Sequence, residues 1–396
     1  MSKTFNVTKL KQIIFSALLG LSANTYADQI DNTQLTVEEL RIEKALKSMP
    51  NVAPRLTARI NEFSTQLAQV TNYTVITQLI IRHATGLWLD AKKSFIQLND
   101  YDDRPLYWAR LQMSKALRTS VGFGKLFPHQ QDKLLWMLEL LSRGQTDVKF
   151  DKKTDKKILL TGFDPFFLDK NIDQSNPSGV VALTLDDLVV SIEGQTAEIE
   201  VLIIPVRFSD FDQGMIEELL SPYIANKSVD MVLTVSMGRD NFDLERYPAL
   251  RRSANAPDNL NIMTGATKET PLVPKLKSTV LQGPEFVEFS LPVSAMKKGA
   301  GRYLVNDNRK ISTLSGGTFN ARLLTELVQQ TSVSGSGGGY LSNEISYRSI
   351  LLRNKHHMAL PVGHIHTPRI SAFDLEALID IVNQTKNIIT QAVVDI

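Results

Sequence analysis

The spacing of apolar residues changes at a charged run, Asp151 to Lys157, and this change limits the possible folds more than any other feature of the sequence. Before the run, apolar residues recur every three or four positions, which predicts amphipathic helices. After it, short runs rich in β-branched residues alternate with helical segments, a pattern typical of an α/β sheet flanked by helices. We therefore expect an all-helical N-terminal region at residues 28–149, a charged linker at 150–157 and an α/β domain at 158–396.

The N-terminal region has a clear helix start. Thr36 and Glu39 form a capping-box pattern, and the helix that they open should end before Pro50. Apolar residues at helical spacing predict further helices at residues 56–70, 106–118 and 128–143. All three tryptophans lie in this region, and their surroundings favour a place in its core over a binding surface: Trp88, Trp108 and Trp136.

The α/β region should hold a sheet with helices on its faces. Strands are expected at residues 158–161, 201–206, 229–235 and 358–362. Helices are expected at residues 178–185, around Met215 to Leu220, from Ser342 onward, and in a closing amphipathic stretch that begins near Ser371 and Asp374. Residues 247–286 are polar and contain prolines, and residues 334–339 are rich in glycine, so both should be mostly loop.

The first 27 residues have the pattern of a secretory signal peptide. Lys3, Lys9 and Lys11 precede an apolar run that is too short for a bilayer span, and small residues stand before a cleavage point at Asp28. We expect an exported protein, periplasmic in a Gram-negative source, without a stable membrane span after the signal is removed. The alternative is an amphipathic first helix in a cytoplasmic protein.

Composition narrows the range of functions. The chain has 396 residues, 43% of them hydrophobic, and a net charge of +2, so it is neither disordered as a whole nor basic enough to suggest nucleic-acid binding. It contains no cysteine. Disulfides, zinc–thiolate sites, iron–sulfur clusters and thiol nucleophiles are therefore excluded.

Two segments that follow expected strands carry groups suited to a ligand site, because ligands bind where α/β strands end. Phe163 and Phe166 could form the apolar wall of a pocket, or could be aromatics buried at a tight turn. Glu245 stands near Arg239 and Arg246, and its carboxylate could orient a catalytic base. The alternative for these three charged residues is a surface salt bridge.

Two further segments supply a hydroxyl and imidazoles. Ser342 follows a glycine run at an expected helix start, where N–H groups favour a developing anion, although serine is also a common helix cap. His364 and His366 follow an expected strand. No third metal ligand accompanies them, so a single histidine acting as general base is favoured over a metal site. Ser342, His366 and Glu245 together have the composition of a hydrolytic triad.

Taken in order, these segments resemble the pyroglutamyl-peptidase I family, also called the pyrrolidone-carboxylate peptidases. The matching stretches are ILLTGFDPF, Asn176-Pro177, IPVRF, VDMVLTVSMGRDNFDLER, NAPDN, Leu291-Pro292, GGYLSNEISY and GHIHTP. They follow the order of the family and cover most of residues 157–396, whereas the helical region lies outside the resemblance.

The resemblance implies a peptidase that removes an N-terminal pyroglutamyl group from peptides and needs no metal or other cofactor. It places the orienting glutamate at Glu245, the base at His366 and the nucleophile at Ser342, where the family has cysteine. Phe163 and Phe166 fall on the pocket for the pyrrolidone ring.

The resemblance also implies substrate contacts around that pocket. The matched positions are Asn176, Gly238, Arg239 and Arg246. Backbone groups near Met237 and Gly238 are expected to hydrogen-bond to the ring amide.

The sequence departs from the family in ways that bear on activity. Ser342 replaces the nucleophilic cysteine, two family glycines become Phe167 and Leu168, and an insertion of roughly 20–30 residues precedes the glycine run. An alkoxide forms less readily than a thiolate, but a serine escapes oxidation in an oxidising compartment.

We therefore weigh three functions: a serine-type hydrolase acting on a peptide, an inactive homologue that binds pyroglutamyl-like peptides, and a scaffold acting through its helical region. A hydrolase needs Ser342 within hydrogen-bond reach of His366 and His366 within reach of Glu245. An inactive homologue should lack this geometry, or have its pocket filled by Phe167 or by the insertion. The oligomeric state is left open.

Overall fold

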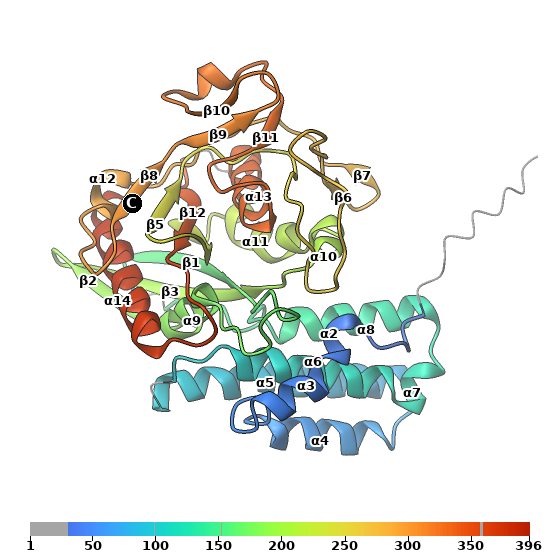
Figure 1. Cartoon of the computed structure of the whole chain (residues 1–396). Coiled ribbons are helices and arrows are strands. Elements are labelled where there is room, and N and C mark those ends of the chain that lie inside the picture. Colours follow the sequence, from blue (N-terminus) through green and yellow to red (C-terminus); the bar gives the residue numbers. More distant parts are fainter. Residues whose placement is uncertain (1–30, 99, 152, 357–358) are drawn as a thin grey trace, which may run out of the picture. The chain divides into compact units, whose positions relative to one another are not determined.

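The computed structural model describes residues 31–98, 100–151, 153–356 and 359–396 (Figure 1). The expected signal peptide, its cleavage point at Asp28 and the start of the expected strand at Met358 lie outside these residues. From Thr33 onward the described chain forms one compact unit. In the described part, no helix combines the length and the apolar character that a membrane span requires.

The region before the sheet is helical, as expected. Its helices are α2 (Val37–Leu40), α3 (Ile42–Ser48), α4 (Thr57–Leu67), α5 (Tyr73–Leu98), α6 (Arg104–Arg118), α7 (Val121–Gly124) and α8 (Pro128–Leu141). The capping box of Thr36 and Glu39 is present at the start of α2. Trp88 and Trp108 are buried, whereas Trp136 is half-buried and donates a hydrogen bond from Nε1 to Glu218 at 2.9 Å.

A mixed sheet forms the centre of the α/β part. Its strands are β1 (Lys156–Phe163), β2 (Leu188–Ile192), β3 (Gln195–Ile204), β4 (Met231–Met237), β5 (Phe242–Glu245), β8 (Val305–Asn308) and β12 (Val362–Thr367), in the spatial order β2-β3-β1-β4-β12-β5-β8. β3, β1, β4 and β12 run parallel to one another, whereas β2 and β5 are antiparallel to their inner neighbours. The parallel strands are buried, as expected for a sheet covered on both faces.

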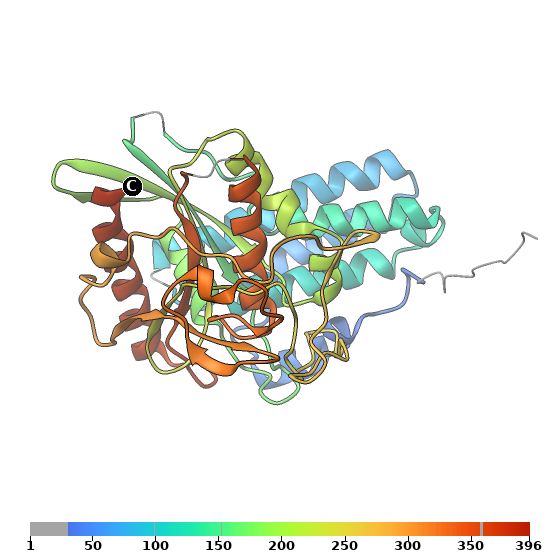
Figure 2. The same cartoon turned by 90° about the horizontal axis from the view of Figure 1, so that it is seen from above.

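Helices cover both faces of this sheet. α9 (Pro177–Leu185) and α14 (Leu375–Ala392) pack together on one face, and α11 (Met215–Ala225) and α13 (Leu341–His356) pack together on the other. Figure 2 shows the two C-terminal helices on opposite sides of the strands. The smaller elements are α10 (Phe208–Asp212), α12 (Val293–Met296), β6 (Lys275–Leu276), β7 (Thr279–Val280), β9 (Lys310–Thr313), β10 (Gly317–Asn320) and β11 (Ser332–Ser334), with single turns of 3₁₀ helix at Leu324–Leu327 and Val393–Asp395.

The helical region and the sheet share buried contacts. One hydrophobic cluster contains Trp88 of α5 and Val201 of β3, and α5 packs against α9. The backbone N–H of Ile203 in β3 donates to the carbonyl of Arg143, just after α8, at 3.1 Å. The α8 end of the helical region is thus joined directly to the sheet.

Three local expectations are wrong or incomplete. The strand expected at 358–362 lies instead at Val362–Thr367, so His364 and His366 are within a strand and do not follow one. Glu245, expected on a loop, ends strand β5. β1 begins at Lys156, inside the expected linker. β12 has no continuous apolar run, because glycine and two histidines interrupt it. β5 does alternate apolar and polar residues, but it has only four residues, the shortest length at which such a pattern indicates a strand.

Candidate active site

The candidate catalytic groups gather at one region of the sheet. Phe163 ends β1 and Met237 ends β4, so the carboxyl ends of two neighbouring parallel strands lie together. His366 pairs with Ser236 across β12 and β4, which places it at the same edge. Ligands bind at this edge of an α/β sheet because the loops and helix N-termini there leave a crevice.

Glu245 and His366 form a buried pair. Oε1 of Glu245 lies 2.6 Å from Nδ1 of His366, and β5 and β12 are adjacent strands. Glu245 is fully buried, and burial raises the pKa of its carboxyl while the hydrogen bond from His366 opposes that rise. With Nδ1 bonded to the carboxylate, Nε2 of His366 has no hydrogen-bond partner in the described chain and is left to act as a base.

The other oxygen of the Glu245 carboxylate accepts a hydrogen bond from Asn308. This residue was not identified in the sequence analysis. Its Nδ2 donates to Oε2 of Glu245 at 2.8 Å and to the carbonyl of Ser336 at 3.0 Å. It therefore ties the carboxylate to the glycine-rich turn before α13. Asn308 ends β8, and no motif around it signals this role.

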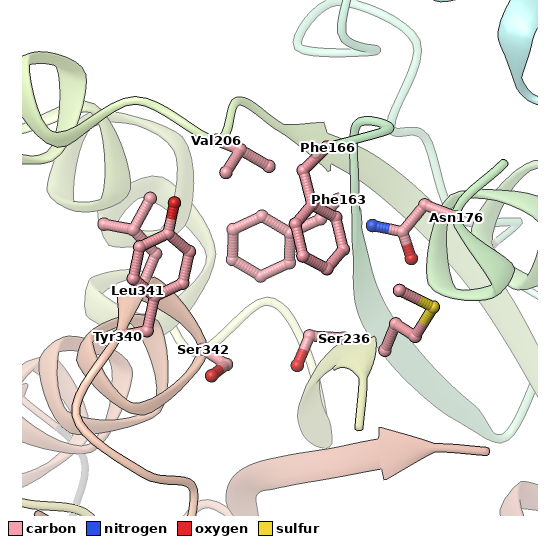
Figure 3. Close-up of a pocket in the computed structure, with 9 residues that line it drawn as sticks. Phe163, Phe166, Asn176, Val206, Ser236, Tyr340, Leu341 and Ser342 are labelled. Carbon is pink, nitrogen blue, oxygen red and sulfur yellow. The ribbon is translucent and has the colours of Figure 1, made fainter. Parts of the chain in front are cut away.

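A small pocket lies beside this pair and has an apolar aromatic wall (Figure 3). It encloses about 400 Å³, counted with its open mouth. Its lining residues are Phe163, Phe166, Asn176, Val206, Ser236, Met237, Tyr340, Leu341 and Ser342. Figure 3 shows the rings of Phe163 and Phe166 on one side and the hydroxyls of Ser236 and Ser342 on another. The pocket is not lined by Phe167, nor by any residue of the stretch 290–331, which precedes the glycine run and holds the expected insertion.

Ser342 lies in the first turn of α13, with its side chain beside the pocket. The helix begins at Leu341, and Oγ of Ser342 donates to the carbonyl of Gly337 at 3.2 Å, so Ser342 does not act as a helix cap. No hydrogen bond joins Ser342 to His366 in the described chain. The backbone N–H groups of Leu341 and Ser342 make no hydrogen bond there either, and they point from a helix N-terminus as anion donors do.

Asn176 and Gly238 lie at the site, but their polar groups are already used. Asn176 lines the pocket, yet its Nδ2 donates to the carbonyl of Asp164 at 2.9 Å and its Oδ1 accepts from Ser178. The N–H of Gly238 donates to the carbonyl of Thr367 at 2.8 Å and is not available to a ligand. A Cβ at Gly238 would lie 2.5 Å from Cβ of His366, so glycine permits the close contact with that ring.

Arg239 and Arg246 lie outside the pocket. The Arg239 side chain is 55% exposed and lies 3.7 Å from Asp243. Arg246 bonds to Asp307 at 2.8 Å and to Glu288 at 3.1 Å. Both arginines thus lie beside carboxylates and away from the aromatic wall. This resembles the surface salt bridge that we weighed as the alternative for these residues.

Within the described chain, one group of carboxylates away from the pocket has the spacing of a cation site. Its members are Asp186, Asp187 and Glu200. The ammonium of Lys92 already lies 2.9 Å from Asp186 and 2.8 Å from Asp187. Burial raises the pKa of Asp186 to about 7 and that of Glu200 to about 8. Lys92 therefore supplies the positive charge in this cluster.

Two family models match separate segments of the chain. Residues 22–139 match a family model described as the PA0049 N-terminal domain, and residues 157–289 and 320–371 match one described as the PA0049 C-terminal domain. The uncharacterized protein PA0049 of Pseudomonas aeruginosa is 26% identical over 390 aligned positions, covering 76% of this chain and 70% of that protein. Residues 290–319, which contain β8 and Asn308, lie outside the match.

The α/β part is also similar to pyrrolidone-carboxylate peptidases. That of Staphylococcus aureus strain JH9 is 27% identical over 215 residues, covering 54% of this chain and 79% of the peptidase. The α/β part has a pyrrolidone-carboxylate-peptidase-like fold. Among solved structures, pyroglutamyl peptidase I of Bacillus amyloliquefaciens is 22% identical with a TM-score of 0.42, covering 61% of this chain and 98% of that chain. The pyrrolidone carboxyl peptidase of Thermococcus litoralis is 20% identical with a TM-score of 0.40, covering 60% and 93%.

Proposed function

We propose that this protein is a serine-type hydrolase that removes an N-terminal pyroglutamyl, or a related cyclic or blocked residue, from peptides. The observation that carries the proposal is the buried Glu245–His366 pair at 2.6 Å beside a small aromatic pocket. A buried carboxylate that orients a histidine is the part of a triad that stabilises the imidazolium formed during proton transfer. The similarity to pyrrolidone-carboxylate peptidases supports the choice of reaction.

In the proposed reaction Ser342 attacks the carbonyl carbon of the residue held in the pocket. Oγ of Ser342 leaves the Gly337 carbonyl by rotation about χ1 and gives its proton to Nε2 of His366. The tetrahedral oxyanion is stabilised by the free N–H groups of the first turn of α13. His366 then returns the proton to the leaving amine, and water hydrolyses the acyl-enzyme by the same route.

The second candidate is a binding protein that does not cleave its ligand. The specific observation in its favour is the missing hydrogen bond between Ser342 and His366, since Ser342 bonds to Gly337. The open pocket and the intact Glu245–His366 pair favour the enzyme, because a binding protein has no chemical need for that pair.

Turnover of a pyroglutamyl fluorogenic amide by the purified protein distinguishes the two candidates. We expect measurable turnover in the wild type and its loss in Ser342→Ala and in His366→Ala, with similar losses because triad members act as a unit. Ser342→Cys should keep or raise activity. No turnover by either the wild type or Ser342→Cys would refute the hydrolase and leave the binding function.

A further inference from the structure

We propose that Ser236 is a fixed hydrogen-bond acceptor at the pocket, and that it selects ligands whose ring carries an N–H group, namely lactams. This inference rests on the proposed function and adds a specificity residue that the sequence analysis did not identify. Ser236 lines the pocket together with Phe163, Phe166 and Ser342 (Figure 3).

The register of two neighbouring strands builds this feature. β4 and β12 are parallel, with Thr234 opposite His364 and Ser236 opposite His366, so all four side chains lie on one face of the sheet. The imidazole of His364 lies between the two hydroxyls. Its Nδ1 is 2.7 Å from Oγ1 of Thr234, and its Nε2 is 2.8 Å from Oγ of Ser236.

The hydrogen bonds of Thr234, His364 and Ser236 together determine which atom carries each proton. Oγ1 of Thr234 also donates to the carbonyl of Gly363, at 3.3 Å. Since a hydroxyl has one proton, Thr234 must then accept from Nδ1–H of His364. Nε2 carries no proton in that tautomer and accepts from Ser236. The opposite tautomer would lose the bond to Gly363, so the first arrangement satisfies one more group.

This arrangement of protons makes the hydroxyl of Ser236 an acceptor toward the pocket. Its only hydroxyl proton is directed at His364, and its remaining lone pairs have no partner in the described chain. A ligand in the pocket therefore meets an acceptor, which a ring N–H satisfies and a ring oxygen does not. Discrimination of this kind is strong because a mismatched polar group leaves a buried acceptor unpaired.

His364 is unsuited to make Ser236 a nucleophile. The imidazole is fully buried and in edge-to-face contact with His366, with ring centroids 4.9 Å apart. Burial and the neighbouring His366 lower the pKa of His364 well below its ordinary value, so it stays neutral and does not take up a proton. Thr234, which faces its other nitrogen, supplies no carboxylate to stabilise an imidazolium. Ser236 is thus a group that positions the ligand.

The test compares two ligands that differ at one ring position: 2-pyrrolidinone, a lactam, and γ-butyrolactone, the lactone in which oxygen replaces the ring N–H. Neither carries the exocyclic amide bond that the proposed reaction cleaves. Their dissociation constants are measured by calorimetry on the full mature chain. We expect the wild type to bind the lactam at least about tenfold more tightly than the lactone, within the range for one buried hydrogen bond. Ser236→Ala should bring the ratio close to one.

Thr234→Val gives a second and independent readout. Without the Thr234 oxygen, the proton of His364 moves to Nε2 and Ser236 turns its own proton toward the pocket, so the preference should shift toward the lactone. Nitrogen NMR of His364 should show protonation at Nδ1 in the wild type and at Nε2 in Thr234→Val. Ser346→Ala is the matched control, because Ser346 is buried on α13 and does not line the pocket.

Each outcome decides the inference. Equal binding of the two ligands by the wild type, no binding of either, or a ratio that Ser236→Ala leaves unchanged would overturn it. The proposed function is judged separately, by turnover of the pyroglutamyl amide. Turnover without lactam preference would refute the role of Ser236 and leave the proposed hydrolase intact. Lactam preference without turnover would refute the hydrolase and leave the role of Ser236 intact.

Discussion

Asp164 is where the helical region meets the pocket loop, and replacing it offers a sharp test of that connection. Asp164 follows Phe163 at the end of β1 and is 3% exposed. Arg110 of α6 contacts both of its oxygens, at 2.9 and 3.1 Å, and Arg143 contacts it at 2.7 Å. Asp164→Asn keeps the size of the side chain and removes its charge.

The two arginines should respond differently. Arg143 keeps an ion pair with Glu139 at 2.7 Å, whereas Arg110 has no other carboxylate ion pair in the described chain. Arg110 is buried, so Asp164→Asn leaves an uncompensated cation, at a cost of about 3–5 kcal/mol. Arg110→Met should cost less, about 1–2 kcal/mol, because Asp164 still pairs with Arg143.

Urea unfolding followed by circular dichroism measures these free energies. The double variant Asp164→Asn/Arg110→Met should be more stable than Asp164→Asn alone, because it removes the orphaned charge. Asp380→Asn serves as the control, since Asp380 pairs with a half-exposed Arg302 at 3.0 Å and should change stability by less than about 1 kcal/mol. A cost below about 1 kcal/mol for Asp164→Asn, or a larger cost for Arg110→Met, would refute the reasoning.

Three further predictions concern other parts of the chain. Phe167 has φ of 62° and is 49% exposed, so Phe167→Gly should raise the free energy of unfolding by up to about 1 kcal/mol in urea titrations while Phe167→Ala does not; a loss of stability would contradict this. Burial raises the pKa of Glu200 to about 8. The pKa of Glu200 is therefore higher in the folded than in the unfolded state, so the free energy of unfolding falls as pH rises between the two values. Glu200→Gln should become increasingly more stable than the wild type from about pH 5 to about pH 9. Parallel pH curves of stability for the two proteins would contradict this prediction. N-terminal sequencing of exported protein should begin near Asp28, and a retained Met1 in the cytoplasmic fraction would defeat the export prediction.

Much of the fold could be read from local patterns. Apolar spacing placed α4, α6 and α8 to within a few residues, and Asp374 caps α14 by accepting from the N–H of Ala377 at 3.0 Å. The longest helix in the described region, α5, received no explicit prediction. Asn72 does cap its start by accepting from two backbone N–H groups of the first turn, at 2.9 and 3.3 Å, so the cap residue was present in the sequence and was overlooked. Gly86 lies inside the helix, and an internal glycine weakens a helical pattern.

The site was predicted in its residue types and only partly in its geometry. The order of motifs along the chain pointed to Glu245, Ser342 and His366, and two of these are in hydrogen-bond contact. Sequence reasoning also placed Arg239 and Arg246 at the substrate. In the structure Arg246 bonds to Asp307, and Arg239 lies 3.7 Å from Asp243, both outside the pocket. The same residue types suit either role, and only the path of the chain decides between them.

The sequence by itself determined the division into a helical region and an α/β region, the absence of thiol chemistry, and the residues able to supply a base and its orienting carboxylate. These features depend on composition and on periodicities that span a few residues. Only the tertiary structure decided that Asn308 holds Glu245, that Asp164 joins the pocket loop to α6, and that Ser236 bonds to His364. Such contacts join residues 54 to 128 positions apart. Their distances depend on strand order and register, which a one-residue shift would change completely.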